Sequence, residues 1–170
     1  FSDFREDSMR EIAHAFADEP YDKFPRRKIA GLSIATMTEY QKGLPVLVAF
    51  PSLDITWPLS RVLGEAGLRH LHIAETEKYA HVTYFFNGGA EEESVGEQRV
   101  LISSITGARI EDVPEMRAAE ITATILEWFD KVDVIIANFA NADMVGHTGD
   151  FQSCIRAVET LDECLGKIME

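Results

Sequence analysis

Hydrophobic and polar positions follow a regular pattern from residue 59 onward. Continuous apolar runs predict buried strands at residues 68–74, 99–103 and 132–137. Around these strands, apolar residues recur every three or four positions, which indicates amphipathic helices. The helices are expected at residues 59–66, 76–86, 114–129 and 150–170. Apolar strands that alternate with helices are typical of an α/β fold in which a parallel sheet is covered on both faces.

The apolar positions of each expected helix indicate which side chains face the core. Spacings of three and four residues place these side chains on one side of the helix. The inward-facing residues are expected to be Leu59, Val62, Leu63 and Ala66 in the first helix, Ile121, Ile125, Leu126 and Phe129 in the third, and Phe151, Cys154, Val158, Leu161, Leu165 and Ile168 in the last.

The first 58 residues have a less regular pattern. Residues 5–16 have helical spacing, and residues 28–37 predict a strand that Gly31 weakens. A short extended run at residues 46–50 ends at Pro51. Proline and glycine mark the stretch around this run, which indicates a linker. The best candidate for this linker is the stretch at about residues 40–58, and the regular pattern follows it.

The chain carries a strong negative charge. Its 170 residues include 29 acidic and 16 basic side chains, which give a net charge of −13 at pH 7. Such a chain repels nucleic acid and anionic lipid, so we expect neither as a partner. It would also repel a phosphorylated substrate unless basic residues gather where that substrate binds. Lysine and arginine residues near a candidate site are therefore informative.

Neither a disulfide nor a membrane segment is expected. Cys154 and Cys164 are ten residues apart in one expected helix and would lie about 15 Å apart, too far for a disulfide. Two reduced thiols fit a cytoplasmic protein. No apolar run reaches the length of a membrane span, and no signal peptide is recognisable. The chain begins with Phe1, and we interpret it as a piece of a longer protein.

The first stretch with candidate chemistry follows the strand expected at residues 132–137. Asp143 and His147 would share one face of a helix, where a carboxylate oxygen and an imidazole nitrogen can bind one cation. Sites in open α/β sheets lie beyond the carboxyl ends of the strands, and this stretch does too. Two ligands do not complete a metal site. The alternative is that Asp143 caps a helix while His147 packs against it.

Two further stretches place a cation at an expected helix start. Lys78 lies where the helix dipole disfavours a positive charge but where free backbone N–H groups attract an anion. Arg5, next to Phe4, is suited to binding a carboxylate or a phosphate. The alternatives are an exposed ion pair between Lys78 and Glu75 or Glu77, and an exposed Arg5 without a ligand.

These stretches match the motifs of a known family. Residues 138–149, NFANADMVGHTG, closely resemble the metal-binding motif of the cofactor-independent phosphoglycerate mutases, which belong to the alkaline phosphatase superfamily. Residues 74–89, AETEKYAHVTYFFNGG, resemble a second block, and residues 4–7, FRED, a third. The resemblance implies part of an alkaline-phosphatase-like domain, with a partial parallel or mixed sheet between helices. It also implies that residues 1–45 are the end of an inserted α/β substrate-binding domain.

The resemblance further implies an activity and residue roles. The family interconverts 3-phosphoglycerate and 2-phosphoglycerate through a phosphoserine and two manganese ions, with magnesium as an alternative and without 2,3-bisphosphoglycerate. By position, Asp143 and His147 match two ligands of one metal ion. Lys78 matches a catalytic lysine that contacts the phosphate, and Arg5 matches a substrate-binding arginine. The implied protein is a cytoplasmic glycolytic isomerase that is a monomer when intact and binds a small-molecule phosphoglycerate.

The chain departs from the family pattern in two ways. Ser8 stands where the family has a second arginine, and losing that donor would cost about 1.5–3 kcal/mol of substrate binding if nothing replaces it. The serine nucleophile and the remaining metal ligands have no match, so the chain by itself is predicted to be inactive. The alternatives are a phosphopentomutase or phosphatase of the same superfamily, and a non-catalytic module that binds a metal or a partner.

Overall fold

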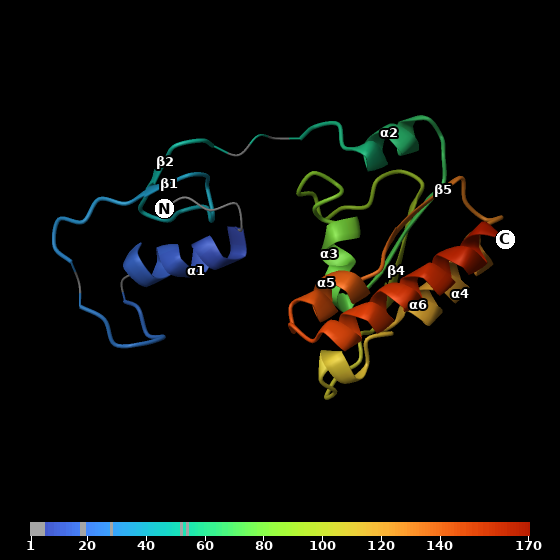
Figure 1. Ribbon diagram of the computed structural model, residues 1–170. Helices are drawn as coiled ribbons and strands as arrows, with labels where there is room; N and C mark the ends of the chain where they lie inside the picture. Colours follow the sequence, from blue (N-terminus) through green and yellow to red (C-terminus); the bar gives the residue numbers. More distant parts are fainter. Residues whose placement is uncertain (1–5, 18–19, 28, 52, 54) are drawn as a thin grey trace. The chain divides into compact units, whose positions relative to one another are not determined.

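The computed structural model describes residues 6–17, 20–27, 29–51, 53 and 55–170. The chain divides into two compact units, Phe1–Asp54 and Ile55–Glu170 (Figure 1). The assignment of these parts to a substrate-binding end, a linker and a metal-binding domain stays a prediction.

In its described residues, the first unit combines a helix with a short pair of parallel strands. Its elements are α1 (Glu6–Ala17), β1 (Ala35–Thr36) and β2 (Leu47–Val48). Met9 and Ala13 of α1 are buried. The side chain of Arg10 donates a hydrogen bond from Nε to the carbonyl oxygen of Tyr40 at 2.9 Å, which holds the helix against the segment that follows β1.

The structure confirms the helix expected at 5–16 as far as it is described and agrees with the extended run at 46–50. The strand expected at 28–37 is wrong, because only Ala35–Thr36 pair as a strand and Lys28 lies outside the described residues. Gly31 adopts a φ of 72°, the left-handed conformation of a turn. The chain therefore turns where the apolar pattern predicted a continuous strand.

The second unit is built on a three-stranded parallel sheet. Its strands are β3 (His70–Glu75), β4 (Glu97–Ile102) and β5 (Val134–Asn138), in the order β4-β3-β5. Each strand is parallel to its neighbour, and all six residues of β3 are buried. The predicted parallel α/β arrangement is therefore confirmed, with strand boundaries shifted by one or two residues.

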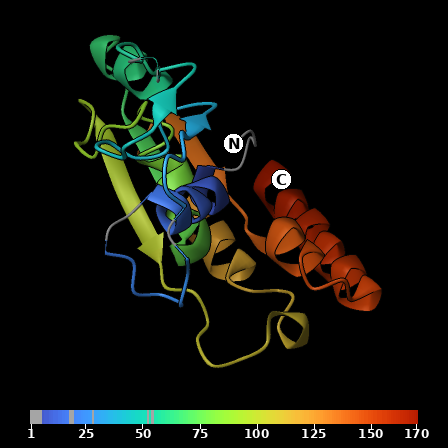
Figure 2. The same ribbon diagram turned by 90° about the vertical axis from the view of Figure 1, so that its left-hand side faces the viewer.

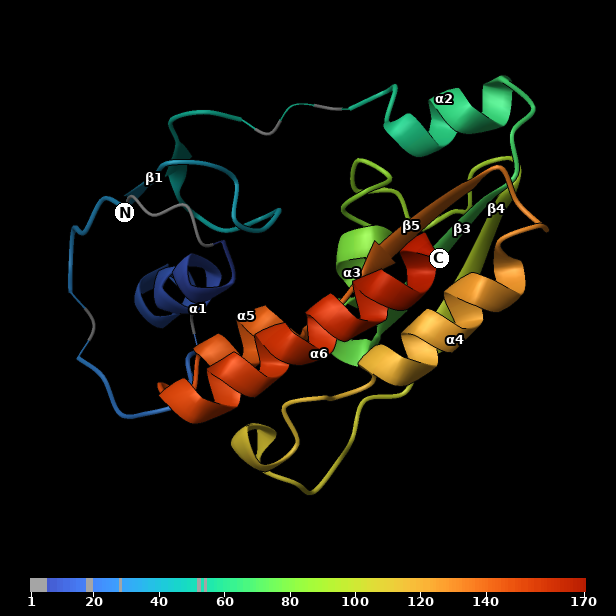
Figure 3. The ribbon, with the colours of Figure 1, turned by 45° about the vertical axis from the view of Figure 1, so that its right-hand side comes forward.

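Helices lie on both faces of this sheet. The helices α4 (Ala118–Trp128) and α6 (Phe151–Met169) run side by side on one face, as Figure 3 shows. The core on that side contains Leu71 and Ile73 of β3. The opposite face of β3 turns towards α3 (Tyr79–Val82), and α2 (Leu59–Glu65) contacts β3 near its start.

Short elements complete the second unit. They are η1 (Thr76–Lys78), η2 (Ile110–Asp112) and α5 (Asn141–Gly146). Figure 2 shows η2 close to the start of α6, where Ser153 Oγ donates a hydrogen bond to the carbonyl oxygen of Glu111 at 2.8 Å. Asp150 caps α6, because its Oδ1 accepts a hydrogen bond from the backbone N–H of Ser153 at 2.7 Å.

Two expected helices are shorter than predicted. The helix expected at 76–86 is limited to η1 and α3, and turns follow Val82. The helix expected at 114–129 begins at Ala118, since Pro114 opens a turn instead. Met116 in that turn has a φ of 45°, a left-handed conformation that a side chain disfavours. Apolar spacing located both segments but did not show these turns.

The helix faces that pack are partly different from those predicted. In α6, the small residues Ser153, Ala157 and Cys164 are buried, whereas Phe151 is 73% exposed and Val158 is 57% exposed. Small side chains let the helix approach its neighbours closely, so the packed face is rotated away from the large apolar residues. Ile121 and Ile125 are buried as predicted. The expected inward residues that are exposed instead are Leu59, Val62, Ala66, Leu126, Phe129, Phe151, Val158 and Leu165.

The two cysteines and the lengths of the helices are visible in the structure. Cys154 is half-buried and Cys164 is buried, and both carry free thiols. Across the described parts of the chain, no helix has the length and apolar character that crossing a bilayer requires.

Gly64 provides a test of how α2 packs within the second unit. A Cβ at Gly64 would lie 2.3 Å from the backbone oxygen of Val95, so we expect Gly64→Ala to lower the free energy of unfolding by about 1–3 kcal/mol. Gly166→Ala in α6 is the matched control, because no atom lies within 4 Å and alanine favours helices by up to about 1 kcal/mol. Urea unfolding measures both; equal stability of the two variants would contradict the close approach.

Candidate functional site

The strand order brings two loops together at one edge of the sheet. β3 has β4 on one side and β5 on the other, so the direction of strand addition reverses at β3. Ala74 near the end of β3 is the register partner of Asn138 at the end of β5. Ligands of open α/β sheets bind beyond the carboxyl ends of strands at such a reversal. The loops after Glu75 and Asn138 meet at this place.

Lys78, Asp143 and His147 lie together in this position. Lys78 ends η1, and its Nζ donates a hydrogen bond to Oδ2 of Asp143. The Lys78 side chain is only 15% exposed, whereas that of Asp143 is half-exposed. Nε2 of His147 lies 3.4 Å from Oδ1 of the same carboxylate. The fold thus brings together three residues that lie in two separate stretches of the sequence.

The helical placement of Asp143 and His147 explains their proximity. Asp143 is in the first turn of α5, and the backbone N–H of His147 donates to its carbonyl oxygen at 3.3 Å. Four residues of helix place the two side chains on one face. Ala140 is the N-cap of α5, so the alternative in which Asp143 caps a helix does not apply. The alternative in which Lys78 pairs with an adjacent glutamate does not apply either, since its partner is Asp143.

These donors fit part of a divalent metal site. A carboxylate oxygen and an imidazole nitrogen on one helix face suit a transition-metal ion. Zinc sites take four ligands and magnesium or manganese sites up to six. Within the described ranges, no group of three or more His, Cys, Asp or Glu side chains could hold a metal ion. Asp143 and His147 therefore supply two donors, and a complete site needs others.

Asn141 anchors the loop that carries these residues. Its side chain is fully buried, and Nδ2 donates to the carbonyl oxygens of Pro114 at 2.8 Å and Glu115 at 2.7 Å. The turn with the left-handed Met116 presents both carbonyl groups to the amide. Sequence reasoning missed this residue; the available signal was an amide side chain two positions before Asp143, directly after a buried strand.

Glu75 is the second site residue that sequence reasoning missed. Its carboxylate is buried at the end of β3, and Oε2 accepts a hydrogen bond from Ser104 Oγ at 3.0 Å. Thr76 Oγ1 accepts one from the backbone N–H of Ser104 at 3.1 Å, which joins the ends of β3 and β4. Oε1 of Glu75 has no hydrogen-bond partner among the described residues. Burial raises the pKa of Glu75, and the bonds from Ser104 and the Arg117 backbone oppose that rise only in part.

The remaining sequence candidates belong to the first unit. Arg5 lies outside the described residues. Ser8 is exposed on α1, and its effect on substrate binding stays a prediction.

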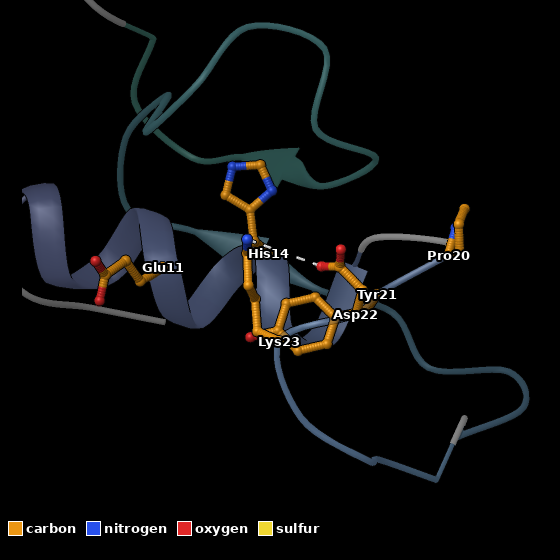
Figure 4. A pocket seen from close by; sticks show the side chains of 6 residues that line it. All are labelled: Glu11, His14, Pro20, Tyr21, Asp22 and Lys23. Carbon is orange, nitrogen blue, oxygen red and sulfur yellow. Dashed lines mark ion pairs between the residues drawn. The ribbon is translucent and has the colours of Figure 1, made fainter.

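The first unit also contains an open hollow of about 520 Å³. Figure 4 shows the side chains that line it: Glu11, His14, Pro20, Tyr21, Asp22 and Lys23. Its cation, Lys23, pairs with Asp22 at 3.9 Å, and both side chains are largely exposed. An exposed pair of this kind holds no ligand in a fixed position. The hollow therefore offers less for chemistry than the sheet edge in the second unit.

Comparison with known proteins identifies a family. A model of the metalloenzyme superfamily matches residues 7–170. The chain is 48% identical over 171 residues to the 2,3-bisphosphoglycerate-independent phosphoglycerate mutase of Moorella thermoacetica, a match that covers 100% of this chain and 33% of the relative. The protein of the same name from Methanococcoides burtonii is 45% identical, with 99% of this chain and 33% of the relative covered.

A solved structure supports the same relationship. Crystal structures of a Leishmania mexicana phosphoglycerate mutase at low cobalt concentration include a chain that matches with a TM-score of 0.69 and 33% identity. The match covers 94% of this chain and 30% of that one. The chain spans about a third of the length of the curated relatives that it matches.

The buried carboxylate of Glu75 gives a pH-dependent prediction. Because the folded-state pKa is raised, the folded chain holds this proton more tightly than the unfolded chain, so stability falls as pH rises from about 4.5 through the folded pKa. Glu75→Gln cannot ionise. Over that window, we expect the free energy of unfolding of Glu75→Gln to increase with pH relative to that of the native chain. The increase should be about 1.4 kcal/mol for each pH unit by which folding raises the pKa of Glu75.

Unfolding by urea at a series of pH values measures this difference. Glu163→Gln is the matched control, because Glu163 is exposed on α6 and does not contribute to the raised pKa of Glu75. A stability difference between Glu75→Gln and the native chain that does not change with pH would contradict the buried, protonation-sensitive carboxyl.

Proposed function

Because the chain belongs to the metalloenzyme superfamily, we propose that it forms part of a 2,3-bisphosphoglycerate-independent phosphoglycerate mutase. Such an enzyme interconverts 3-phosphoglycerate and 2-phosphoglycerate. The observation that carries the proposal is the meeting of Lys78 with Asp143 and His147 at the carboxyl edge of the sheet. Relatives of that name, 45–48% identical over nearly this whole chain, support it.

Asp143 and His147 are proposed as two ligands of one divalent metal ion. Their donor types and shared helix face support this role, and the remaining ligands would come from other parts of a longer protein. We propose manganese, two ions per intact enzyme, with magnesium as the alternative; the relative studied at low cobalt concentration supports a divalent ion. Bound divalent ions stabilise the charge that develops on a transferring phosphoryl group.

Lys78 is proposed to bind the phosphate of the substrate. Its side chain is largely buried, and Asp143 holds its ammonium group at the edge where the two loops meet. A lysine binds phosphate as a point charge, and a fixed position lowers the cost of ordering it. In a chain with a net charge of −13, such a focused cation opposes the general repulsion of an anionic substrate. Arg5 is proposed as a second, substrate-binding cation.

The rest of the machinery is proposed to lie outside these residues. A serine nucleophile would form the phosphoserine intermediate, and further ligands would complete the metal sites. Residues 1–45 would end the substrate-binding domain, 46–58 would link it, and 59–170 would form part of the metal-bearing domain. The intact enzyme is proposed to be a cytoplasmic monomer of glycolysis that needs no 2,3-bisphosphoglycerate and binds neither nucleic acid nor membranes.

The metal ligands can be tested in an intact protein that carries this chain. We expect Asp143→Asn and His147→Ala each to lower kcat/KM for phosphoglycerate by at least about 100-fold, since even the residues that orient metal ligands contribute 10–100-fold. Bound metal, measured by elemental analysis, should fall in parallel. The controls are Asp162→Asn and His81→Ala, which change exposed residues of the same types. Unchanged metal content in both ligand variants would argue against the assignment.

The chain by itself is expected to be inactive. Two metal ligands and no matching nucleophile cannot complete the phosphoryl transfer, so 3-phosphoglycerate incubated with the 170-residue chain and manganese should yield no 2-phosphoglycerate. The Moorella thermoacetica relative under the same conditions is the positive control. Measurable turnover by the isolated chain would refute this division of the machinery.

A further inference from the structure

A continuous line of hydrogen bonds crosses the face of β3 that turns towards α3. His70 and His72 are both fully buried, and Nδ1 of His70 lies 2.8 Å from Nε2 of His72. At one end of the line, Nδ1 of His72 lies 2.5 Å from the carbonyl oxygen of Val82. At the other end, Nε2 of His70 lies 3.3 Å from the carbonyl oxygen of Val95.

The two carbonyl groups determine how many protons this line needs. A carbonyl oxygen can only accept a hydrogen bond, so the ring nitrogens that face Val82 and Val95 must both carry a proton. Between the rings, one nitrogen must donate and the other must accept. The line is satisfied by three N–H groups on four ring nitrogens, whereas two neutral imidazoles provide only two.

We propose that His70 and His72 form a buried proton-binding site that holds one proton more than two neutral rings, shared across their 2.8 Å contact. Each neutral arrangement leaves a bare ring nitrogen facing a carbonyl oxygen, which is costly for a buried pair. If both rings are neutral and Nδ1 of His72 carries a proton, Nε2 of His70 has none and faces the carbonyl oxygen of Val95. If Nε2 of His70 carries the proton instead, Nδ1 of His72 has none and faces the carbonyl oxygen of Val82, at a much shorter distance.

One carboxylate, paired with Arg99, lies close to the two histidines. Glu97 Oε1 lies 3.8 Å from Nδ1 of His72, and the carboxylate is buried. Burial alone would raise the pKa of Glu97, but the hydrogen bonds from Ser94, Arg99 and Asn87 outweigh it and lower the pKa, so this group stays ionised. Burial is the largest influence on His72 and lowers its pKa, with smaller contributions from His70 and Arg99, whereas the Val82 carbonyl and Glu97 act in the opposite direction. The added proton therefore follows from the N–H groups that the two carbonyl oxygens require, and not from the charges around the pair.

The other elements around the pair bring few competing groups. On α3, burial raises the pKa of Tyr79, with Arg99 opposing the rise and Glu97 adding to it, and His81 is exposed. On α2, Arg61 and Glu65 are exposed and bond to each other. β5 between Val134 and Asn138 has no titratable side chain. The loop before β4 contributes the exposed residues Glu91, Glu92 and Glu93.

The site predicts a maximum in stability near neutral pH. Histidines of an unfolded chain titrate near pH 6.5, so the unfolded pair binds two added protons well below this pH and none well above it. The folded pair would keep one added proton both below and above pH 6.5. Below pH 6.5 the unfolded state binds more protons and stability rises with pH; above pH 6.5 the folded state binds more and stability falls. If the folded pair held no shared proton, stability would rise up to about pH 6.5 and then stay constant.

Unfolding of the chain between pH 5 and 9 tests the site against His70→Gln. Glutamine can still donate to Nε2 of His72 but cannot hold the added proton. We expect the unfolding midpoint of the native chain to fall relative to that of His70→Gln as pH rises from about 6.5 to 9. His81→Gln, which removes an exposed histidine, should keep the native profile. A constant difference between native and His70→Gln above pH 6.5 would overturn the proposal.

A second measurement needs no substitution. Nitrogen-15 NMR of the histidine-labelled chain distinguishes an imidazolium from each neutral tautomer. We expect two coupled rings that lose one shared proton with a midpoint above pH 6.5. Two rings that are both neutral at pH 6.5, with no further proton lost at higher pH, would overturn the proposal even if His70→Gln failed to fold.

Discussion

Complete enclosure of β3 is the constraint on which the second unit depends. The strand is hydrogen-bonded to β4 on one side and β5 on the other, and its alternate side chains enter two different environments. Leu71 and Ile73 join an apolar core under α4, whereas His70 and His72 face α3. A polar group buried on such a strand costs free energy unless it is hydrogen-bonded, and both histidine rings and Oε2 of Glu75 have partners. This requirement produces both the ordered histidine pair and the fixed position of the loop after Glu75.

The sequence predicted the architecture of this unit better than its helix faces. Apolar runs located all three strands, because a parallel strand between two layers needs apolar residues on both sides. Periodicity also located α6, but the packed face follows Ala157 and Cys164 rather than Val158 and Leu165. Small side chains carry little hydrophobic signal yet allow the closest packing. Likewise, Gly31 and Met116 introduce turns through backbone conformation, which an apolar pattern does not report.

The site was predictable residue by residue but not as an assembly. Spacing and position suggested Asp143 and His147 as one unit and Lys78 as another. Their meeting follows from the reversal of strand order at β3, which single stretches of sequence do not reveal. Asn141 and Glu75 escaped notice because their roles are supporting ones: each fixes a loop by bonding to a distant part of the chain. Such long-range polar contacts appear only once the fold is known.

The apolar residues left on the surface of α6 affect how this chain would respond to denaturant. The steepness of urea unfolding and the accompanying heat-capacity change both scale with the surface newly exposed on unfolding. Phe151, Val158 and Leu165 are already in contact with water in the folded state, so they add little to either quantity. The unfolding transition of the second unit should therefore be broader than that of an equally long domain that buries these side chains.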